Sequence, residues 1–115
     1  MSVTIYHNPK CSKSRHTLEL LSAKGITPTI IEYIKNPPTV EKLNEILSQL
    51  GIAPRELMRK KENTYIELEL GNSSLSDNNL IDFMVEHPIL IERPIVIAKG
   101  KAALGRPPEQ VLDIL

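Results

Sequence analysis

The sequence predicts an α/β fold in which a βαβ half and a ββα half share a four-stranded mixed sheet. Strand-like runs of β-branched residues lie near both ends of the chain, helical periodicity fills its middle, and glycine and proline residues separate the segments. With 115 residues, of which 41% are hydrophobic, we expect a single domain, residues 1–115, with a modest core.

The first half of the predicted sheet lies in the N-terminal third of the chain. Residues 3–6 are predicted to form a strand, because β-branched and aromatic side chains favour extended backbone. A helix is expected over residues 14–24, with Ser14 as its cap and Gly25 just beyond its end. Residues 29–34 form a second apolar run. A strand, a helix and a strand within roughly thirty residues predict a parallel pair with a right-handed crossover.

Residues 37–87 are predicted to form a helical block inserted between the two halves of the sheet. Thr39 can cap a helix that continues to Leu50, and Ser76 can cap another. Residues 65–70 fit either a short helix or an extended piece. Apolar residues at helical spacing are expected to face inward in the two capped helices: Val40, Leu43, Ile46, Leu47, Leu50, Leu80, Ile81, Phe83 and Met84.

The last third returns to strands. Residues 94–98 and 102–104, joined by a Lys-Gly-Lys turn, predict a β-hairpin, and a short helical segment is expected over residues 109–115. This order of elements matches the thioredoxin-like fold, a four-stranded mixed sheet with helices on its faces. Such folds place a cis proline before the third strand, facing the active-site cysteine, so the Arg93–Pro94 bond is predicted to be cis.

The only cysteine, Cys11, lies where the first predicted strand turns into the first helix. The backbone N–H groups and dipole of a helix N-terminus favour an anion there, and Lys10, Lys13 and Arg15 add positive charge. His7 could orient or deprotonate the thiol, or simply hydrogen-bond locally. A lone cysteine is most often a small buried apolar residue, but these polar neighbours make a poor core. We therefore predict a reactive thiolate.

Composition narrows the range of functions. Fourteen basic and fourteen acidic residues balance, no apolar run is long enough to span a bilayer, and no leader is evident, so neither nucleic acid nor a membrane is expected as a partner. A single cysteine excludes an internal disulfide, a CxxC pair and a cysteine-rich metal site, and it suits the reducing cytoplasm. If Cys11 is oxidised, the resolving thiol must come from another molecule.

Arginines supply the second candidate feature. Arg93 and Arg106 each precede a proline, which fixes the backbone at these corners. Guanidinium groups bind tetrahedral oxyanions bidentately and stay charged. If Arg59, Arg93 and Arg106 converge on Cys11 they form an anion site, and otherwise they are solvated surface residues. Arg15 follows Cys11 too closely for the phosphate loop of cysteine phosphatases.

Ordered motifs along the chain carry a family resemblance: Ile5–Arg15, Pro37–Pro38, Arg55–Lys60, Leu80–Met84, His87–Val96 and Gly105–Glu109. Together they closely resemble the glutaredoxin-coupled arsenate reductases of the ArsC type, and within them a short branch of uncharacterised reductases. The resemblance implies that Cys11 is the nucleophile. It also implies that arsenate is bound by Arg59, Arg93 and Arg106. The residues that it implies as support for the site are His7, Ser14, Arg15 and Pro94.

The resemblance also implies a reaction. Arsenate binds among the arginines, the Cys11 thiolate attacks arsenic, glutathione attacks the thio-arsenate as co-substrate, and glutaredoxin clears the mixed disulfide. No bound cofactor and no metal are expected, and the protein is expected to be a monomer. Two departures from the better-known members bear on the substrate: Ser12-Lys13 replaces small residues after the cysteine, and the chain stops at Leu115 without their C-terminal tail. The change at Ser12-Lys13 predicts weak turnover.

Two other functions stay open. One is a thiol oxidoreductase that acts on glutathionylated substrates. The other is a non-enzymatic stress regulator of a related family, which binds RNA polymerase and often switches through a CxxC disulfide. Here Ser14 stands at the position of the second cysteine, so this disulfide switch is missing.

Overall fold

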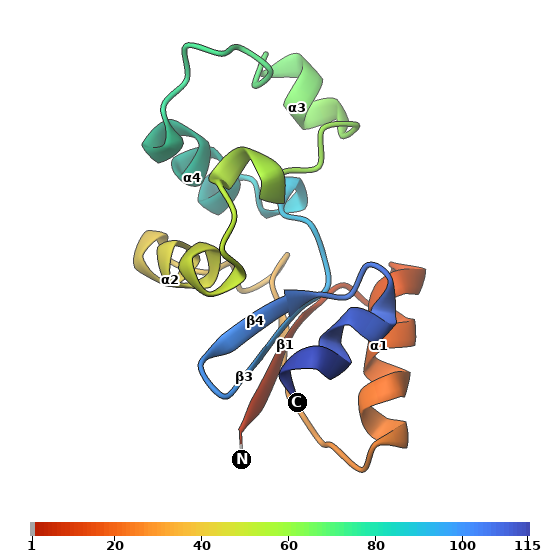
Figure 1. The fold of residues 1–115 in the computed structure, drawn as a ribbon. Helices are drawn as coiled ribbons and strands as arrows, with labels where there is room; N and C mark the ends of the chain where they lie inside the picture. The colour runs from red at the N-terminus through yellow and green to blue at the C-terminus, as the bar shows by residue number, and fades with distance from the viewer. Residues whose placement is uncertain (1) are drawn as a thin grey trace. The chain divides into compact units, whose positions relative to one another are not determined.

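The computed structural model describes residues 2–115 and divides into two compact units. The sheet unit comprises residues 2–36 and Arg93–Leu115, and the helical unit comprises Pro37–Glu92 (Figure 1). The helical block expected over residues 37–87 lies within the second unit. The α/β class is confirmed, whereas the single-domain organisation stays a prediction.

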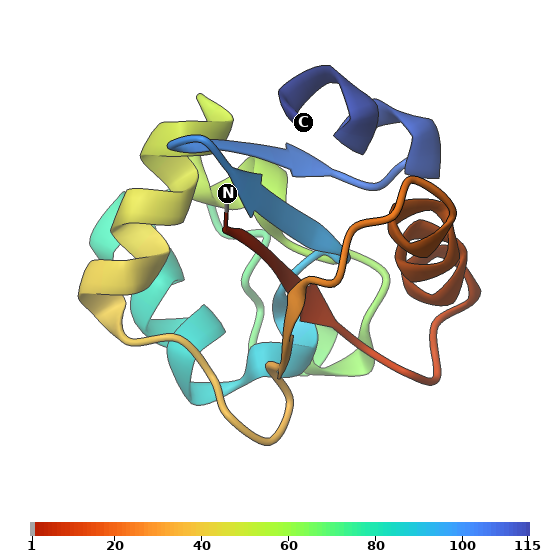
Figure 2. The ribbon, with the colours of Figure 1, turned by 90° about the horizontal axis from the view of Figure 1, so that it is seen from below.

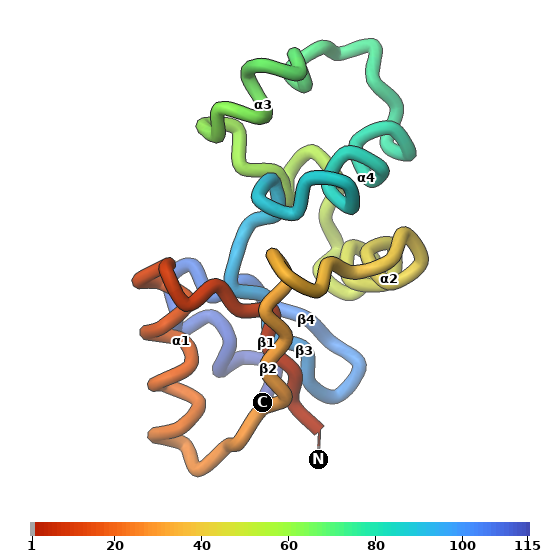
Figure 3. The backbone as a smooth tube through the Cα atoms, turned by 180° about the vertical axis from the view of Figure 1, so that it is seen from behind, coloured from red at the N-terminus to blue at the C-terminus, as the bar shows by residue number. Residues whose placement is uncertain are grey.

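The sheet has four strands: β1 (Val3–His7), β2 (Thr29–Glu32), β3 (Ile95–Ala98) and β4 (Lys101–Leu104). Their order is β2-β1-β3-β4, with β1 parallel to β2 and the other neighbours antiparallel, which confirms the predicted mixed sheet (Figure 3). β2 ends two residues earlier than predicted. The carbonyl of Glu32 accepts hydrogen bonds from the N–H groups of Lys35 and Asn36, at 3.0 and 2.9 Å, and these close a turn that leaves the sheet.

Two segments cover one face of this sheet, α1 (Ser12–Ala23) and the 3₁₀ segment η3 (Pro108–Ile114), which lie next to each other in Figure 2. The register places Val3 opposite Ala98 and Ile5 opposite Val96, so all four share that face. Burial of these side chains with Leu21 and Val111 forms the core of the sheet unit, and the transfer of this apolar surface from water stabilises the unit.

The start of α1 corrects one prediction. Cys11, not Ser14, occupies the N-cap position, with extended backbone at φ −98° and ψ 123°. The N–H of Arg15 donates to the carbonyl of Cys11 at 3.0 Å, which is the first helical hydrogen bond. Ser14 instead lies inside the first turn and is completely buried. Gly25 follows the helix at φ 74°, where glycine is favoured, as predicted.

The helical unit holds three α-helices and two 3₁₀ turns: α2 (Val40–Leu50), α3 (Asn63–Glu67), α4 (Asp77–Glu86), η1 (Pro54–Leu57) and η2 (Pro88–Leu90). The predicted caps are confirmed, since Thr39 accepts from Lys42 N–H and Ser76 accepts from Asn79 N–H, both at 3.1 Å. Val40 was wrongly expected to face inward: it is the first residue of α2 and is 38% exposed, and the buried face of the helix begins at Leu43.

Arg55 holds together residues 65–72, which include the stretch 65–70 that the sequence left ambiguous. Its Nη1 donates to the hydroxyl of Tyr65 at 2.9 Å and to the carbonyl of Leu70 at 2.6 Å. Its Nη2 donates to the carbonyl of Asn72 at 3.1 Å. Residues 65–70 are thus helical as far as Glu67, where α3 ends, and the turn that follows is fixed by the Arg55 side chain.

Candidate active site

A tight turn between β1 and α1 positions Cys11. The N–H of Cys11 donates to the carbonyl of Asn8 at 3.0 Å, and the N–H of Lys10 donates to Asn8 Oδ1, also at 3.0 Å. An asparagine that accepts from the backbone two residues later is typical of such turns. Arg15 closes the turn from the helix side, since its Nη1 donates to the carbonyl of Pro9 at 2.9 Å. The turn therefore fixes the thiol at the helix N-terminus.

Arg106 is the arginine that contacts the cysteine. Its Nη2 lies 3.9 Å from Cys11 Sγ, and its Nε donates to the carbonyl of Arg93 at 2.8 Å. The carbonyl thus holds the guanidinium in place while its Nη2 faces the sulfur. Cys11 is only 8% exposed, so this charge acts on a sulfur largely withdrawn from water. A cation and a helix N-terminus together favour the binding of an anion beside the sulfur.

The other two predicted arginines, Arg93 and Arg59, have other contacts in the structure. Arg93 contributes its carbonyl to the position of Arg106, and the Arg93–Pro94 bond is cis, as predicted. The Arg106–Pro107 bond is also cis, which the sequence did not predict. Arg59 belongs to the helical unit, where its guanidinium pairs with the carboxylates of Glu62 and Glu92. Anion binding by Arg59 and by the Arg93 side chain stays a prediction.

His7 and Ser14 form a buried pair beside the turn. His7 Nδ1 lies 2.6 Å from Ser14 Oγ, and the same hydroxyl accepts from the N–H of Asn8 at 3.1 Å. Burial lowers the pKa of His7 below 6.5, Glu32 opposes this and Arg15 adds to it. A neutral imidazole can accept the hydroxyl proton at Nδ1 and keep its own proton on Nε2. Ser14 therefore supports His7 and the turn instead of capping the helix.

The lowered pKa of His7 predicts a specific pH dependence of stability. Folding disfavours the protonated imidazole of His7. The free energy of unfolding therefore begins to fall as pH drops below 6.5, the pKa of His7 in the unfolded chain, and it continues to fall until pH reaches the lower pKa of the folded state. The free energy of unfolding, measured with urea, should fall more steeply between about pH 7.5 and about pH 5.5 in the wild type than in His7→Gln. Exposed His16 serves as control, and His16→Gln should keep the wild-type slope.

Gly105 sets the approach of the Arg106 corner to α1. Its N–H donates to the carbonyl of Pro94 at 3.0 Å. A Cβ at this position would lie 2.4 Å from Thr17 Oγ1 and 2.7 Å from Pro94 Cγ. Thr17 is completely buried and donates to the carbonyl of Lys13 at 2.9 Å, so it is held in place. No sequence pattern predicts this contact between Gly105 and Thr17, because the two residues are far apart along the chain.

Gly105→Ala should therefore destabilise the fold. Overpacking at a closed contact costs about 1–3 kcal/mol, and we expect the upper half of this range in the free energy of unfolding measured with urea. Gly71→Ala is the matched control: its Cβ would meet nothing nearer than Tyr65 Cε1 at 3.8 Å, so its stability should stay within about 0.5 kcal/mol of the wild type. Equal stability of the two variants would contradict the packing argument.

Across residues 2–115, no helix combines the length and apolarity that crossing a bilayer requires. Within the same residues, no group of three or more histidine, cysteine, aspartate or glutamate side chains is arranged to hold a metal ion.

Comparison with known proteins connects this site to a family. The model of the ArsC family matches residues 6–114. The chain is 54% identical over 114 residues to an uncharacterized protein, YfgD, of Escherichia coli (strain K12), covering 98% of this chain and 96% of that protein. It is 50% identical over 115 residues to "Arsenate reductase" of Rhizobium meliloti (strain 1021), covering 100% of this chain and 82% of that protein.

Solved structures agree with this relationship. A structure described as "Arsenate reductase from Vibrio cholerae" superposes with a TM-score of 0.98 at 59% identity, covering 100% of this chain and 98% of that one. The chain belongs to the ArsC family.

Proposed function

We propose that the protein is an arsenate reductase that takes electrons from glutathione and is recycled by glutaredoxin. The observation that carries the proposal is the Arg106 guanidinium, held 3.9 Å from the Cys11 sulfur at a helix N-terminus. Family relatives named as arsenate reductases, 48–50% identical to this chain, support the choice of oxyanion.

The proposed reaction begins with binding of the oxyanion. Arg106 binds the oxyanion, with Arg93 and Arg59 as the further proposed ligands. The Cys11 thiolate attacks arsenic, a sulfur–arsenic bond forms, and an oxygen leaves as hydroxide or water. Glutathione then attacks the adduct, and arsenic gains two electrons and departs as arsenite. The two sulfurs supply these electrons and become a mixed disulfide of Cys11 and glutathione.

A second thiol must complete the cycle. Cys11 is the only cysteine of the chain, so the mixed disulfide cannot be resolved from within. Glutaredoxin, with further glutathione, reduces it and returns the thiolate. These partners belong to the reducing cytoplasm, where we place the protein as a monomer with no bound cofactor.

The two rival functions differ in their use of Cys11. An oxidoreductase of glutathionylated substrates needs the same thiol but no oxyanion. A regulator that switches through a disulfide needs a second thiol, and the corresponding Ser14 is buried with its hydroxyl engaged by His7. The structure therefore favours enzymatic use of Cys11 over the regulator.

The test is NADPH oxidation, with glutathione reductase to recycle the glutathione, in the presence and absence of arsenate. The rate should require arsenate, glutathione and glutaredoxin together, and it should be low because of Ser12-Lys13 after the nucleophile. If glutathionylated substrates give a Cys11-dependent rate and arsenate gives none, the oxidoreductase function replaces this proposal.

A further inference from the structure

Arg59 is held in place by a short backbone pairing within the helical unit. A β-bridge joins Met58 to Ile91, and both side chains are buried, at 4% and 2% exposure. Two backbone hydrogen bonds of 2.8 Å flank the bridge, from Arg59 N–H to Leu90 O and from Glu92 N–H to Leu57 O. In such an antiparallel pairing, Arg59 and Glu92 are diagonal neighbours, within reach of long side chains.

A local turn brings a second carboxylate to the same arginine. The N–H of Glu62 donates to the carbonyl of Arg59 at 3.3 Å, and Arg59 Nη1 in turn donates to Glu62 Oε1. On its other edge, Arg59 Nε lies 3.7 Å from Glu92 Oε1. The three side chains are only 24–25% exposed, so water screens their charges less than on an open surface.

Two carboxylates thus share one guanidinium, and the three groups together carry a formal charge of −1 when all are ionised. We propose that Glu62 and Glu92 compete with the substrate anion for Arg59 and so set the affinity of the site for divalent oxyanions. This inference rests on the proposed function, in which Arg59 is an oxyanion ligand.

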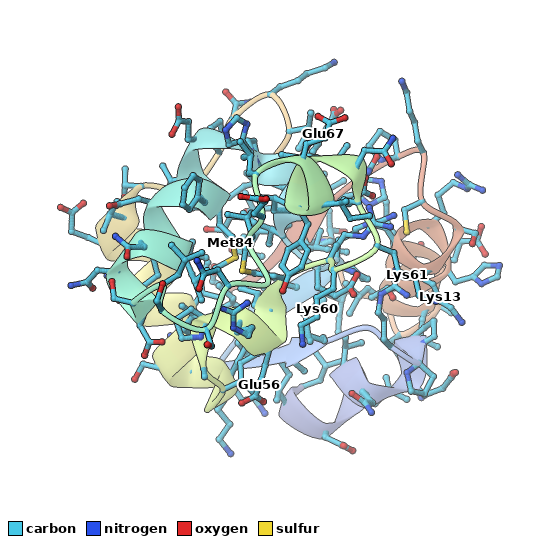
Figure 4. All side chains as sticks on the ribbon, turned by 90° about the horizontal axis from the view of Figure 1, so that it is seen from above. Lys13, Glu56, Lys60, Lys61, Glu67 and Met84 are labelled. Atoms are coloured by element: carbon cyan, nitrogen blue, oxygen red, sulfur yellow. The ribbon has the colours of Figure 1, made fainter. Side chains whose placement is uncertain are left out.

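Competition follows from the donor geometry. A guanidinium binds an oxyanion well through parallel N–H groups, and Nη1 and Nε of Arg59 face carboxylates in this structure. A divalent anion must replace one of these partners and approach the other against like charge. Exposed Lys60 and Lys61, labelled in Figure 4, follow Arg59 and attract anions toward the segment without relieving this competition.

The test measures anion binding without turnover. Inorganic phosphate, a tetrahedral oxyanion that does not oxidise thiols, is titrated calorimetrically into the full-length protein in the absence of glutathione. Glu62→Gln and Glu92→Gln should each tighten phosphate binding about three- to tenfold, because an amide leaves Arg59 available. Exposed Glu67 on α3, labelled in Figure 4, supplies the control, and Glu67→Gln should leave the Kd unchanged.

A double-mutant cycle separates competition from a structural effect. In an Arg59→Ala background, the same glutamine substitutions should change the Kd less than about twofold, because the competed group is gone. Tm is measured for every variant, and Glu92→Gln alone decides the matter if Glu62→Gln does not fold. Unchanged or weaker phosphate binding in the folded glutamine variants overturns the inference.

The inference and the proposed reaction can fail separately. If the wild type reduces arsenate in a Cys11-dependent manner but the glutamine variants bind phosphate no more tightly, only the competition is wrong. If the variants bind phosphate more tightly but no arsenate reduction depends on Cys11, the anion site stands and the proposed reaction is wrong.

Discussion

Cys11→Ser should abolish arsenate reduction. Cys11 is the only sulfur nucleophile of the chain, and a serine hydroxyl at the same position is not ionised near neutral pH, so no thio-arsenate can form. We expect kcat/KM to fall by at least about a thousandfold, which corresponds to roughly 4 kcal/mol of lost transition-state stabilisation. The coupled NADPH assay with glutathione and glutaredoxin measures this directly.

The control must separate lost chemistry from lost structure. Sulfur and hydroxyl oxygen differ little in size, so Cys11→Ser should remain folded and should still bind phosphate near Arg106. Ser12→Ala, at the exposed next position, should keep most of the wild-type rate. A substantial arsenate-dependent rate in Cys11→Ser would show that the reaction runs through another group.

Local sequence signals predicted much of the fold because they act over a few residues. The β3–β4 hairpin is an example: Lys99 and Gly100 have φ of 56° and 74°, the left-handed backbone that a two-residue hairpin turn requires. The caps of α2 and α4 are similar, since each hydroxyl bonds three residues ahead. Such features can be predicted from neighbours alone.

The errors arose where one side-chain or backbone group had more than one possible hydrogen-bond partner. Ser14 looked like a helix cap, but its hydroxyl is engaged by His7, seven residues away, and by the N–H of Asn8. The early end of β2 depends on a turn closed by Glu32, which the apolar run from Thr29 concealed. A residue pattern shows which groups are available, but not which partner is nearest in the fold.

The candidate site divides in the same way. The strand-to-helix turn that places Cys11 is local, so its position was predicted correctly. Arg106 is 95 residues away in sequence, and its contact with the sulfur depends on the sheet and on the packing of Gly105. The carboxylates at Arg59 show both cases, because Glu62 lies one turn away whereas Glu92 reaches it through a backbone bridge.

Arg106→Ala should reduce kcat/KM for arsenate about ten- to a hundredfold. The substitution removes the guanidinium that faces the Cys11 sulfur, which in the proposed reaction is also a bidentate ligand of the oxyanion. Hydrogen bonds to charged groups contribute about 1.5–3 kcal/mol each. Tm should change much less, because Arg106 is partly exposed and its guanidinium is directed at the Cys11 sulfur and the Arg93 carbonyl, not at an apolar core.

Arg106→Lys distinguishes charge from geometry. Lysine keeps a positive charge near the sulfur but lacks the planar fork that bonds the Arg93 carbonyl and, in the proposed reaction, also the oxyanion. If geometry matters, kcat/KM of Arg106→Lys should lie closer to that of Arg106→Ala than to the wild type. Lys101→Ala, at an exposed cation on β4, should leave the rate unchanged. A wild-type rate in Arg106→Ala would contradict the anion site, because the guanidinium beside the sulfur would then have no part in the reaction.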